Sequence, residues 1–211
     1  MPVMFPPGVP VSKRLFDYSL TLFLLVLLSP LLLVVALLVR LIHGSPVLFR
    51  HVRPGYRARP FTLLKFRTMR DLAGPDGAPL SDEARLTGFG RLLRALSFDE
   101  LPQLLNILRG EMSWVGPRPL LMQYLERYSP EQARRHDVLP GITGWAQVNG
   151  RNNVSWEDKF ALDVWYVDHW SFWLDIKIFF LTAWKVLARE GINEPGNATA
   201  REFMGSLDGK P

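Results

Sequence analysis

The 211-residue sequence predicts a mixed α/β protein that is mainly helical, with few short strands, an N-terminal membrane segment and interfacial amphipathic helices. The membrane segment is predicted by Leu20–Val39, an uncharged stretch of 20 residues that is long enough to cross a bilayer core. Short strands are predicted at Val47–Val52 and Phe61–Phe66, on either side of a turn-like Pro-Gly pair. An amphipathic helix is predicted at Ser171–Arg189 by apolar residues at three- and four-residue spacing.

Composition and charge exclude several classes of protein. The chain has no Cys, which excludes a disulfide scaffold, a Cys-ligated metal site and a thiol nucleophile. Its 21% charged and 12% aromatic residues exclude a charge-extended disordered chain. The net charge of +5 divides into +6 for residues 1–60 and −1 for residues 61–211. Because the positive charge is concentrated around one apolar stretch, we expect no nucleic-acid partner.

Two topologies fit the apolar stretch. Ser29-Pro30 lies in its middle, and Pro30 removes an amide donor and clashes with the carbonyl of Val26, so a kink is expected there. The Ser29 hydroxyl could satisfy the carbonyl that this frees. Positive residues lie both before the stretch, at Lys13 and Arg14, and after it, at Arg40, Arg50 and Arg53. Positive residues favour the cytoplasmic face, which suits a re-entrant hairpin, whereas a kinked spanning helix remains the alternative.

The rest of the chain alternates short elements with loops. Residues 71–83 carry Gly and Pro and are predicted to form a loop. A basic helix is predicted at Arg85–Ala95, and a second helix is predicted from its N-cap, Ser97, to Gly110. After it we expect a strand at 111–115, helices at 120–128, 130–137 and 155–169, extended chain at 140–150, and a loose tail after Glu190.

Aromatic residues favour contact between the second half of the chain and a membrane surface. Six of the seven Trp lie between positions 145 and 184. In Ser171–Arg189, an aromatic and aliphatic stripe includes Trp173, Phe180 and Trp184. Such faces suit the headgroup boundary of a bilayer, although a core-facing helix would show the same spacing.

Asp99-Glu100 is the most informative pair of residues for chemistry. Adjacent carboxylates in a first helical turn are also favoured by the helix dipole, so the pair alone is ambiguous. Cations surround it in the sequence, however, at Arg91, Arg94, Lys65, Arg67, Arg109, Arg118 and Arg151. Carboxylates among cations suit a phosphate-bearing substrate and Mg²⁺, and an Asp can act as a nucleophile at phosphorus. The four His are widely spaced and show no metal-ligand pattern.

The ordered set of motifs resembles the bacterial sugar transferases, the monotopic phosphoglycosyl transferases that begin glycan assembly on a polyprenyl phosphate. The resemblance covers roughly residues 13–187. It rests on Lys13-Arg14-Leu15-Phe16-Asp17, Ser29-Pro30, Lys65-Phe66-Arg67-Thr68-Met69, Ser97-Phe98-Asp99-Glu100-Leu101-Pro102-Gln103-Leu104, Gly116-Pro117-Arg118-Pro119 and Pro140-Gly141-Ile142-Thr143-Gly144-Trp145-Ala146-Gln147-Val148-Asn149-Gly150-Arg151.

This resemblance implies a reaction and a set of roles. Asp99 would attack the β-phosphorus of a UDP-sugar, release UMP and hold the phospho-sugar covalently until polyprenyl (undecaprenyl) phosphate takes it. Mg²⁺ would offset phosphate charge, with Asp99 and Glu100 as its candidate ligands, or Glu100 would instead assist the acceptor. The residues implied to bind phosphate or nucleotide are Lys65, Arg67, Arg94, Arg118, Gln147 and Arg151.

The resemblance also implies a topology and a location. Ser29 and Pro30 would form the kink of a re-entrant helix–break–helix, so that both ends face the cytoplasm at the bacterial inner membrane. The chain then divides into a membrane hairpin with its flank (1–45), a catalytic domain with interfacial helices (46–190) and a loose tail (191–211). Residues 71–83 could cover the site.

Two alternatives use the same features differently. A membrane-anchored, Mg²⁺-dependent phosphatase or nucleotidyl transferase could use the same pair of carboxylates. A non-enzymatic membrane scaffold could use its basic segment to bind anionic lipid.

Overall fold

The computed structural model describes residues 6–74, 76–150, 155–188 and 202–205. Within this part, helices greatly outnumber strands, which confirms the predicted mainly helical α/β class. The elements, in which η marks a 3₁₀ helix, are α1 (Val11–His43), β1 (Leu48–Pro54), η1 (Tyr56–Ala58), β2 (Pro60–Phe66), α2 (Asp82–Arg85), α3 (Gly88–Ala95), η2 (Phe98–Gln103), α4 (Leu104–Leu108), β3 (Ser113–Val115), η3 (Met122–Glu126), α5 (Pro130–Ala133), η4 (Arg134–His136), β4 (Gly141–Thr143), α6 (Trp145–Asn149), α7 (Trp156–Asp168) and α8 (Phe172–Leu187).

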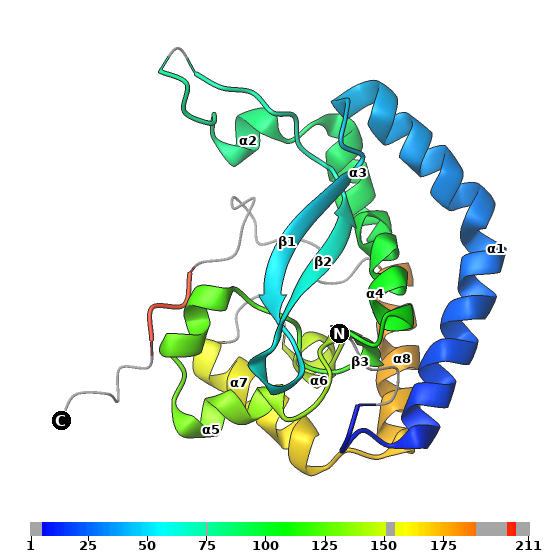
Figure 1. The fold of residues 1–211 in the computed structure, drawn as a ribbon, viewed down its shortest axis with the longest axis vertical. Helices are drawn as coiled ribbons and strands as arrows, with labels where there is room; N and C mark the ends of the chain where they lie inside the picture. The colour runs from blue at the N-terminus through cyan, green and yellow to red at the C-terminus, as the bar shows by residue number, and fades with distance from the viewer. Residues whose placement is uncertain (1–5, 75, 151–154, 189–201, 206–211) are drawn as a thin grey trace.

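The described strands form two small sheets. β1 and β2 pair antiparallel, from Leu48 opposite Phe66 to Pro54 opposite Pro60, and make the long ribbon at the centre of Figure 1. This confirms the two predicted strands and the turn between them. β3 and β4 pair in parallel, with Ser113 opposite Gly141. The second pair joins segments far apart in the sequence and positions the turn that follows β3.

Helix α1 is continuous through Pro30, so the predicted break into two short helices is not present in the structure. The Ser29 hydroxyl donates to the carbonyl oxygen of Val26 at 2.9 Å. That carbonyl is the one that loses its amide partner at Pro30, because an α-helical amide bonds four residues back. The side chain therefore replaces the missing donor, as predicted, and the helix bends without ending. Figure 1 shows α1 as a bow.

Both ends of α1 contact the rest of the chain, whereas its middle faces outward. The first turns are buried through Lys13, Arg14 and Asp17. Near the other end, Val35 and Val39 pack in a core cluster with Phe66 and Leu93. The helix is long and apolar enough to cross a membrane, and only 11% of its most apolar window is buried. It is therefore not an ordinary core helix.

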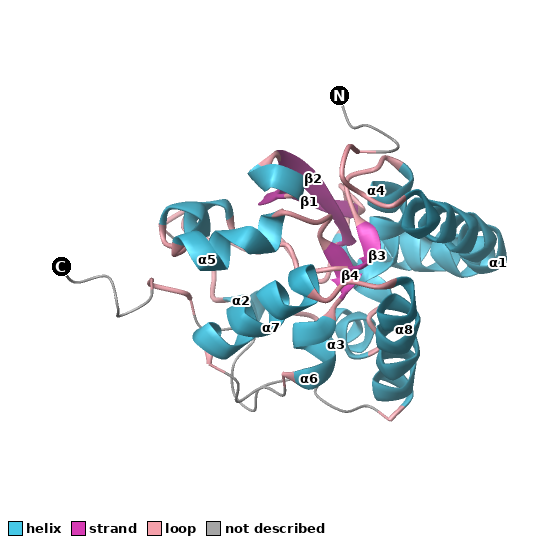
Figure 2. Cartoon of the chain, turned by 90° about the horizontal axis from the view of Figure 1, so that it is seen from below, coloured by secondary structure: helices cyan, strands magenta, loops and turns pink. Residues whose placement is uncertain are grey.

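Helix α8 has one packed face and one exposed aromatic face. Ile178 is fully buried, whereas Trp173, Phe180 and Trp184 are 77%, 67% and 68% exposed. The aromatic stripe therefore does not simply face the core, which favours the interfacial interpretation. The edges of the Phe172 and Phe179 rings meet Phe16 of α1. In both views, α1 and α8 lie on the same side of the molecule, so their exposed apolar faces adjoin (Figures 1 and 2).

Several predicted boundaries between residues 85 and 110 are wrong. The helix predicted at Arg85–Ala95 is α3, which begins at Gly88 because the Thr87 hydroxyl accepts from the amide of Gly90. Ser97 makes no capping hydrogen bond; its backbone is left-handed, with φ of 55°. The single helix predicted from Ser97 is η2 followed by α4. Pro102 lies inside η2 and has no amide hydrogen, so one α-helical hydrogen bond, to the carbonyl of Phe98, is missing where the single helix was predicted.

The segment predicted as extended at 140–150 is extended only in β4 and becomes helical in α6. Its glycines permit close approach of two backbones. A methyl group at Gly141 would lie 2.1 Å from the amide nitrogen of Gly116, and one at Gly144 would lie 2.2 Å from the oxygen of Gly116. These positions therefore accept only glycine.

Part of the C-terminal tail is packed. Most of residues 191–211 lie outside the described residues, but 202–205 are described. The Phe203 side chain is 1% exposed and contacts Tyr124 and Phe160 edge-on. Arg127 donates to Glu202 at 2.8 Å and to the carbonyl of Phe203. At this point the tail is held against the body of the protein.

Candidate active site

The Asp99-Glu100 pair lies in η2, which packs against β2. The left-handed turn at Ser97 separates η2 from α3 and redirects the chain at the pair. Left-handed backbone is uncommon for a non-glycine residue and costs about 1–2 kcal/mol. Such strained positions cluster at functional sites.

Asn106 fixes the segment after the pair to β2. Its side-chain oxygen accepts from the amide of Leu64 at 3.1 Å, and its nitrogen donates to the carbonyl of Thr62 at 2.7 Å. The same nitrogen donates to Glu111 at 2.6 Å, and the side chain is fully buried. Asn106 therefore sets the alignment of Lys65, the next residue of β2, with η2. Sequence reasoning missed this role, because an Asn inside an apolar helix has no motif of its own.

Glu100 is held by two cations. Its Oε1 atom lies 2.6 Å from Nζ of Lys65 and 2.5 Å from Nη2 of Arg118. Burial raises the pKa of the Glu100 carboxyl, but Arg118 and Lys65 outweigh that effect and lower it to about 2. Glu100 is therefore ionised throughout the physiological range and is a poor proton acceptor.

Asp99 is in the opposite electrostatic situation. It is 8% exposed, and within the described residues its carboxylate makes no hydrogen bond or ion pair closer than 4 Å. Burial and the neighbouring Glu100 charge raise its pKa, while Lys65, Arg94 and Arg118 act in the opposite direction. Two adjacent carboxylates thus have pKa values that are pushed apart, which is the pattern of groups with different chemical roles.

The remaining predicted site residues divide into three groups. The structure brings Lys65, Arg94 and Arg118 around the pair; the Arg94 Nε atom also donates to the Thr68 hydroxyl at 3.1 Å. Arg67 is directed elsewhere, to Asp71 at 2.8 Å and to the carbonyl of Pro46 at 3.2 Å. Arg151 lies outside the described residues.

Gln147 lies beside the turn that carries Arg118. Its Oε1 atom would be 2.8 Å from a methyl group at Gly144, the residue that packs against Gly116. Neither the nitrogen nor the oxygen of its buried amide has a hydrogen-bond partner in the described part of the chain. Buried amides are normally satisfied, so this group is available to a ligand.

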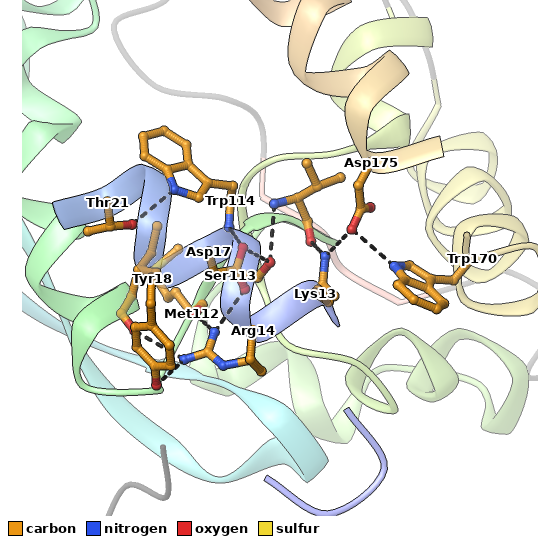
Figure 3. A network of polar contacts seen from close by, with 12 residues as sticks. Lys13, Arg14, Asp17, Tyr18, Thr21, Met112, Ser113, Trp114, Trp170 and Asp175 are labelled. Atoms are coloured by element: carbon orange, nitrogen blue, oxygen red, sulfur yellow. Dashed lines mark hydrogen bonds and ion pairs between the residues drawn. The ribbon is translucent and has the colours of Figure 1, made fainter. Parts of the chain in front are cut away.

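A buried polar network ties α1 to the base of the same turn (Figure 3). Lys13 Nζ donates to the carbonyl of Val115 at 2.9 Å and to Asp175 at 2.5 Å. Asp175 also accepts from the Tyr166 hydroxyl at 2.6 Å and from Trp170 at 3.0 Å. Val115 is the last residue before the Gly116–Pro119 turn. The network therefore connects α1, α8 and the turn that presents Arg118.

A second set of contacts lies one turn further along α1. Arg14 donates to Asp17 at 2.9 Å and to the carbonyl of Met112 at 2.9 Å. Asp17 accepts from the Ser113 hydroxyl at 2.9 Å and from the amide of Trp114 at 3.1 Å. In the sequence, Lys13 and Arg14 count as part of the positive charge that flanks the apolar stretch. They are buried in ion pairs whose partners the sequence did not reveal.

The carboxylates of Asp99 and Glu100 fit Mg²⁺ only together with oxygen ligands from a substrate. Among the described residues there is no group of three or more His, Asp or Glu side chains that could hold a metal ion. Mg²⁺, however, is commonly bound by one or two carboxylates plus phosphate oxygens and water. Within the described residues the Asp99 carboxylate has no partner, and both contacts of Glu100 there are to a single oxygen. These two residues could therefore hold Mg²⁺ against a phosphate.

The arrangement as a whole suits covalent chemistry at phosphorus. It combines a buried carboxylate, which makes no hydrogen bond to any other described residue, with three surrounding cations, two of which the neighbouring carboxylate holds. A carboxylate can form an acyl phosphate, and the cations would stabilise charge on the phosphoryl oxygens.

Comparisons with known proteins find sugar transferases among the relatives of this chain. A family model described as "Bacterial sugar transferase" matches residues 9–189. The chain is 60% identical over 198 residues to the "Uncharacterized sugar transferase EpsL" of Bacillus subtilis, covering 94% of this chain and 98% of that protein.

Two further relatives have more specific names. The "Undecaprenyl-phosphate glucose phosphotransferase" of Komagataeibacter xylinus is 46% identical over 82% of this chain, which spans 35% of that protein. The "UDP-glucose:undecaprenyl-phosphate glucose-1-phosphate transferase" of Caulobacter vibrioides is 42% identical over 87% of this chain and 72% of that protein. The matched region is thus nearly the whole of one relative and about a third of another.

Proposed function

The chain belongs to the bacterial sugar transferase family, and on this basis we propose that it transfers a sugar 1-phosphate from a UDP-sugar to undecaprenyl phosphate, releasing UMP. The observation that carries the proposal is the buried Asp99, which has no partner in the part of the chain that the structure describes and is surrounded by Lys65, Arg94 and Arg118. The product would be a polyprenyl-diphospho-sugar, the starting unit of glycan assembly.

We propose a reaction in two displacements at one phosphorus atom. First, a carboxylate oxygen of Asp99 bonds to the β-phosphorus. The bond from that phosphorus to the bridging oxygen breaks, and UMP leaves with this oxygen and the electron pair. Second, an oxygen of undecaprenyl phosphate attacks the same phosphorus, and the Asp99 carboxylate leaves. Lys65, Arg94 and Arg118 hold the phosphate oxygens and lower the cost of the charge that develops.

Glu100 serves this reaction as a positioning residue. Its low pKa and its bonds to Lys65 and Arg118 disfavour a role as the base for the acceptor. Its charge also raises the pKa of Asp99, which makes that carboxylate a more basic nucleophile. Mg²⁺, held by Asp99 and Glu100 with the substrate, would supply further neutralisation of phosphate charge.

The activity is tested by UMP release from a panel of UDP-sugars with undecaprenyl phosphate. We expect release with one or a few sugars and transfer of radiolabelled sugar phosphate first to the protein and then to the lipid. A phosphatase would release inorganic phosphate without an acceptor, and a nucleotidyl transferase would release diphosphate. A membrane scaffold would turn over no UDP-sugar. Each alternative therefore gives a result that differs from the one expected of the proposed transferase.

The raised pKa of Asp99 predicts that the first half-reaction, the covalent labelling of Asp99, slows at low pH. Its pH–rate profile should therefore have an acid limb. Protonated Asp99 cannot attack, so covalent labelling should rise with pH, with a midpoint above 3.8, the ordinary value for Asp. Lys65→Met removes a cation that lowers this pKa and should move the limb to higher pH. The measurement is single-turnover labelling against pH, with Lys159→Met as the control. A limb at or below pH 3.8 would show that Asp99 is not the titrating nucleophile.

We also propose that the protein is seated in one leaflet on the cytoplasmic face of the bacterial inner membrane. The support is that both ends of α1 pack against one catalytic body while its bowed middle is exposed (Figure 1). A straight spanning helix would place these ends on opposite sides of the bilayer. The exposed aromatic face of α8 adjoins α1 and suits the headgroup boundary.

Single cysteines test this topology, because the chain contains none. Pro7→Cys and Ser45→Cys introduce thiols at exposed positions before and after α1. In intact cells we expect both to resist a membrane-impermeant thiol reagent in the periplasm and to react after permeabilisation. The control is a periplasmic protein with an exposed thiol, whose labelling shows that the reagent reached the periplasm. Labelling of Pro7→Cys alone from outside would contradict the re-entrant arrangement.

A further inference from the structure

Arg135, in η4, is a buried arginine that bonds to the backbone of Arg118. It is 3% exposed, and its Nη2 atom donates to the carbonyl oxygen of Arg118 at 2.8 Å. The side chain of Arg118 in turn contacts Glu100 at 2.5 Å. Two successive contacts therefore link Arg135 to the pair of carboxylates, although Arg135 itself lies outside the candidate site.

The guanidinium of Arg135 is held in place by Asp163 of α7. The Oδ2 atom of Asp163 accepts from Nη2 at 2.7 Å and from Nε at 3.1 Å. Two bonds from one planar group fix its orientation as well as its position. The ring centroids of Tyr128 and Phe160 lie 5.7 and 5.5 Å from the guanidinium carbon, and the Tyr128 hydroxyl accepts from Nη1 at 3.3 Å. The donor that reaches Arg118 therefore has little freedom to move.

The backbone of the turn that carries Arg118 is fixed at successive residues. Gly116 and Pro117 bond through their backbones to the two ends of β4, at 2.9 and 3.0 Å. Pro117 and Pro119 restrict the backbone angle φ on either side of Arg118. The hydrogen bond from Arg135 then holds the carbonyl of Arg118 itself. The site cation thus extends from a backbone that is held before it, after it and at its own position.

Stability alone does not explain an ion pair at this position. The side chains of Arg135 and Asp163 are 2% and 5% exposed. Removing two charges from water is costly, so a buried ion pair often stabilises a fold no better than well-packed apolar side chains of similar volume. Apolar side chains, however, could not donate to the carbonyl of Arg118. A hydrogen-bond donor at a fixed position is therefore what the pair adds.

We propose that Arg135 is a positioning residue, which acts through the backbone of Arg118 to direct that guanidinium toward Glu100 and the β-phosphate of the UDP-sugar. This inference rests on the proposed function. The side chain of Arg118 is 45% exposed, so its direction depends strongly on where its backbone is held. A misplacement of about 1 Å in a group that binds the transferred phosphate can lower the rate by about 100-fold.

The test removes the ion pair as a whole, in Arg135→Met/Asp163→Asn, so that no uncompensated buried charge remains. Single-turnover labelling of the protein by UDP-sugar is measured with Arg118 present and in an Arg118→Gln background. We expect the rate to fall about 10- to 100-fold with Arg118 present and by less than about 3-fold further in Arg118→Gln, because a residue that acts through Arg118 loses its effect once that guanidinium is absent. An equal fold-loss in both backgrounds, or no loss in either, would overturn the inference.

The pH profile of labelling separates positioning from general destabilisation. Burial and the charge of Glu100 raise the pKa of Asp99, and Arg118 is one of three cations that oppose this rise. Displacement of Arg118 should therefore move the acid limb of labelling to higher pH, in the same direction as Arg118→Gln. A loss of folded protein would lower labelling at every pH without moving the limb. A lower rate with an unmoved limb therefore contradicts the inference.

Two further variants keep the outcomes distinct. Arg134→Met is the matched control and should label like wild type, because Arg134 is the neighbouring arginine of η4 and makes surface ion pairs with Glu131 and Asp168. Arg135→Lys retains the charge that Asp163 requires but not the planar fork, so it should remain folded and show a smaller loss with the same shift of the limb. If neither Arg135 variant is folded where wild type labels, Arg135 is required by the fold and the inference is overturned. Absence of labelling by wild type would instead refute the proposed function.

Discussion

Asp99→Asn should abolish turnover, lowering the rate of covalent labelling by about 10⁴-fold or more. The asparagine amide has nearly the same shape as the carboxylate but is not a competent nucleophile. We expect the substitution to leave the stability of the fold intact. Burial and Glu100 raise the pKa of Asp99, so its charged form is less stable in the folded protein than in the unfolded chain. Removing that charge should leave the unfolding temperature at neutral pH unchanged or higher.

The measurement pairs single-turnover labelling with thermal unfolding in the same detergent. Asp137→Asn is the control, because Asp137 is an exposed aspartate outside the site. Activity loss together with retained or increased stability is the signature of a site residue whose charge is unfavourable for folding. Labelling of Asp99→Asn at the wild-type rate would remove Asp99 from the reaction and leave the chemistry without a nucleophile.

The carboxylate pair and its cations were predictable, because they lie in compact local motifs. Asp99 and Glu100 are adjacent in the sequence. Lys65 lies near the end of a short strand pattern, and Arg118 lies in a proline-rich turn. Arg67 lies in the same motif as Lys65, yet it contacts Asp71. Lys65 lies within β2, whereas Arg67 follows the end of that strand at Phe66, so the two positions of one motif need not reach one site.

The residues that position the site were not predictable, since their partners are distant in sequence. Lys13 and Asp175 are 162 residues apart, and no local pattern relates them. Counting Lys13 and Arg14 with the positive charge that flanks α1 therefore overstated the basic character of the surface around this helix, because both side chains are buried. The helix boundary at Ser97 was missed for a different reason: serine is a frequent N-cap, but here its backbone is left-handed and its side chain makes no capping hydrogen bond.

The packing of α1 against the catalytic body depends on the Lys13–Asp175 ion pair, and Lys13→Met should destabilise the protein by about 3–5 kcal/mol. The side chains of the pair are 4% and 1% exposed, so removal of one partner leaves an uncompensated buried charge. The carbonyl of Val115 also loses a donor, immediately before the turn that presents Arg118. We therefore expect weaker UDP-sugar turnover as well as a lower unfolding temperature.

The double variant Lys13→Met/Asp175→Asn distinguishes the charge from the hydrogen bonds. An asparagine at position 175 is neutral, and its one side-chain oxygen can still accept from either Tyr166 or Trp170, which now donate to different oxygens of the carboxylate. It should therefore recover part of the stability that Lys13→Met loses, as measured by unfolding in detergent. Lys177→Met, which replaces an exposed lysine of the same helix α8, is the control. If Lys13→Met unfolds like wild type, α1 is held mainly by its apolar contacts, and the ion pair contributes to position without contributing to stability.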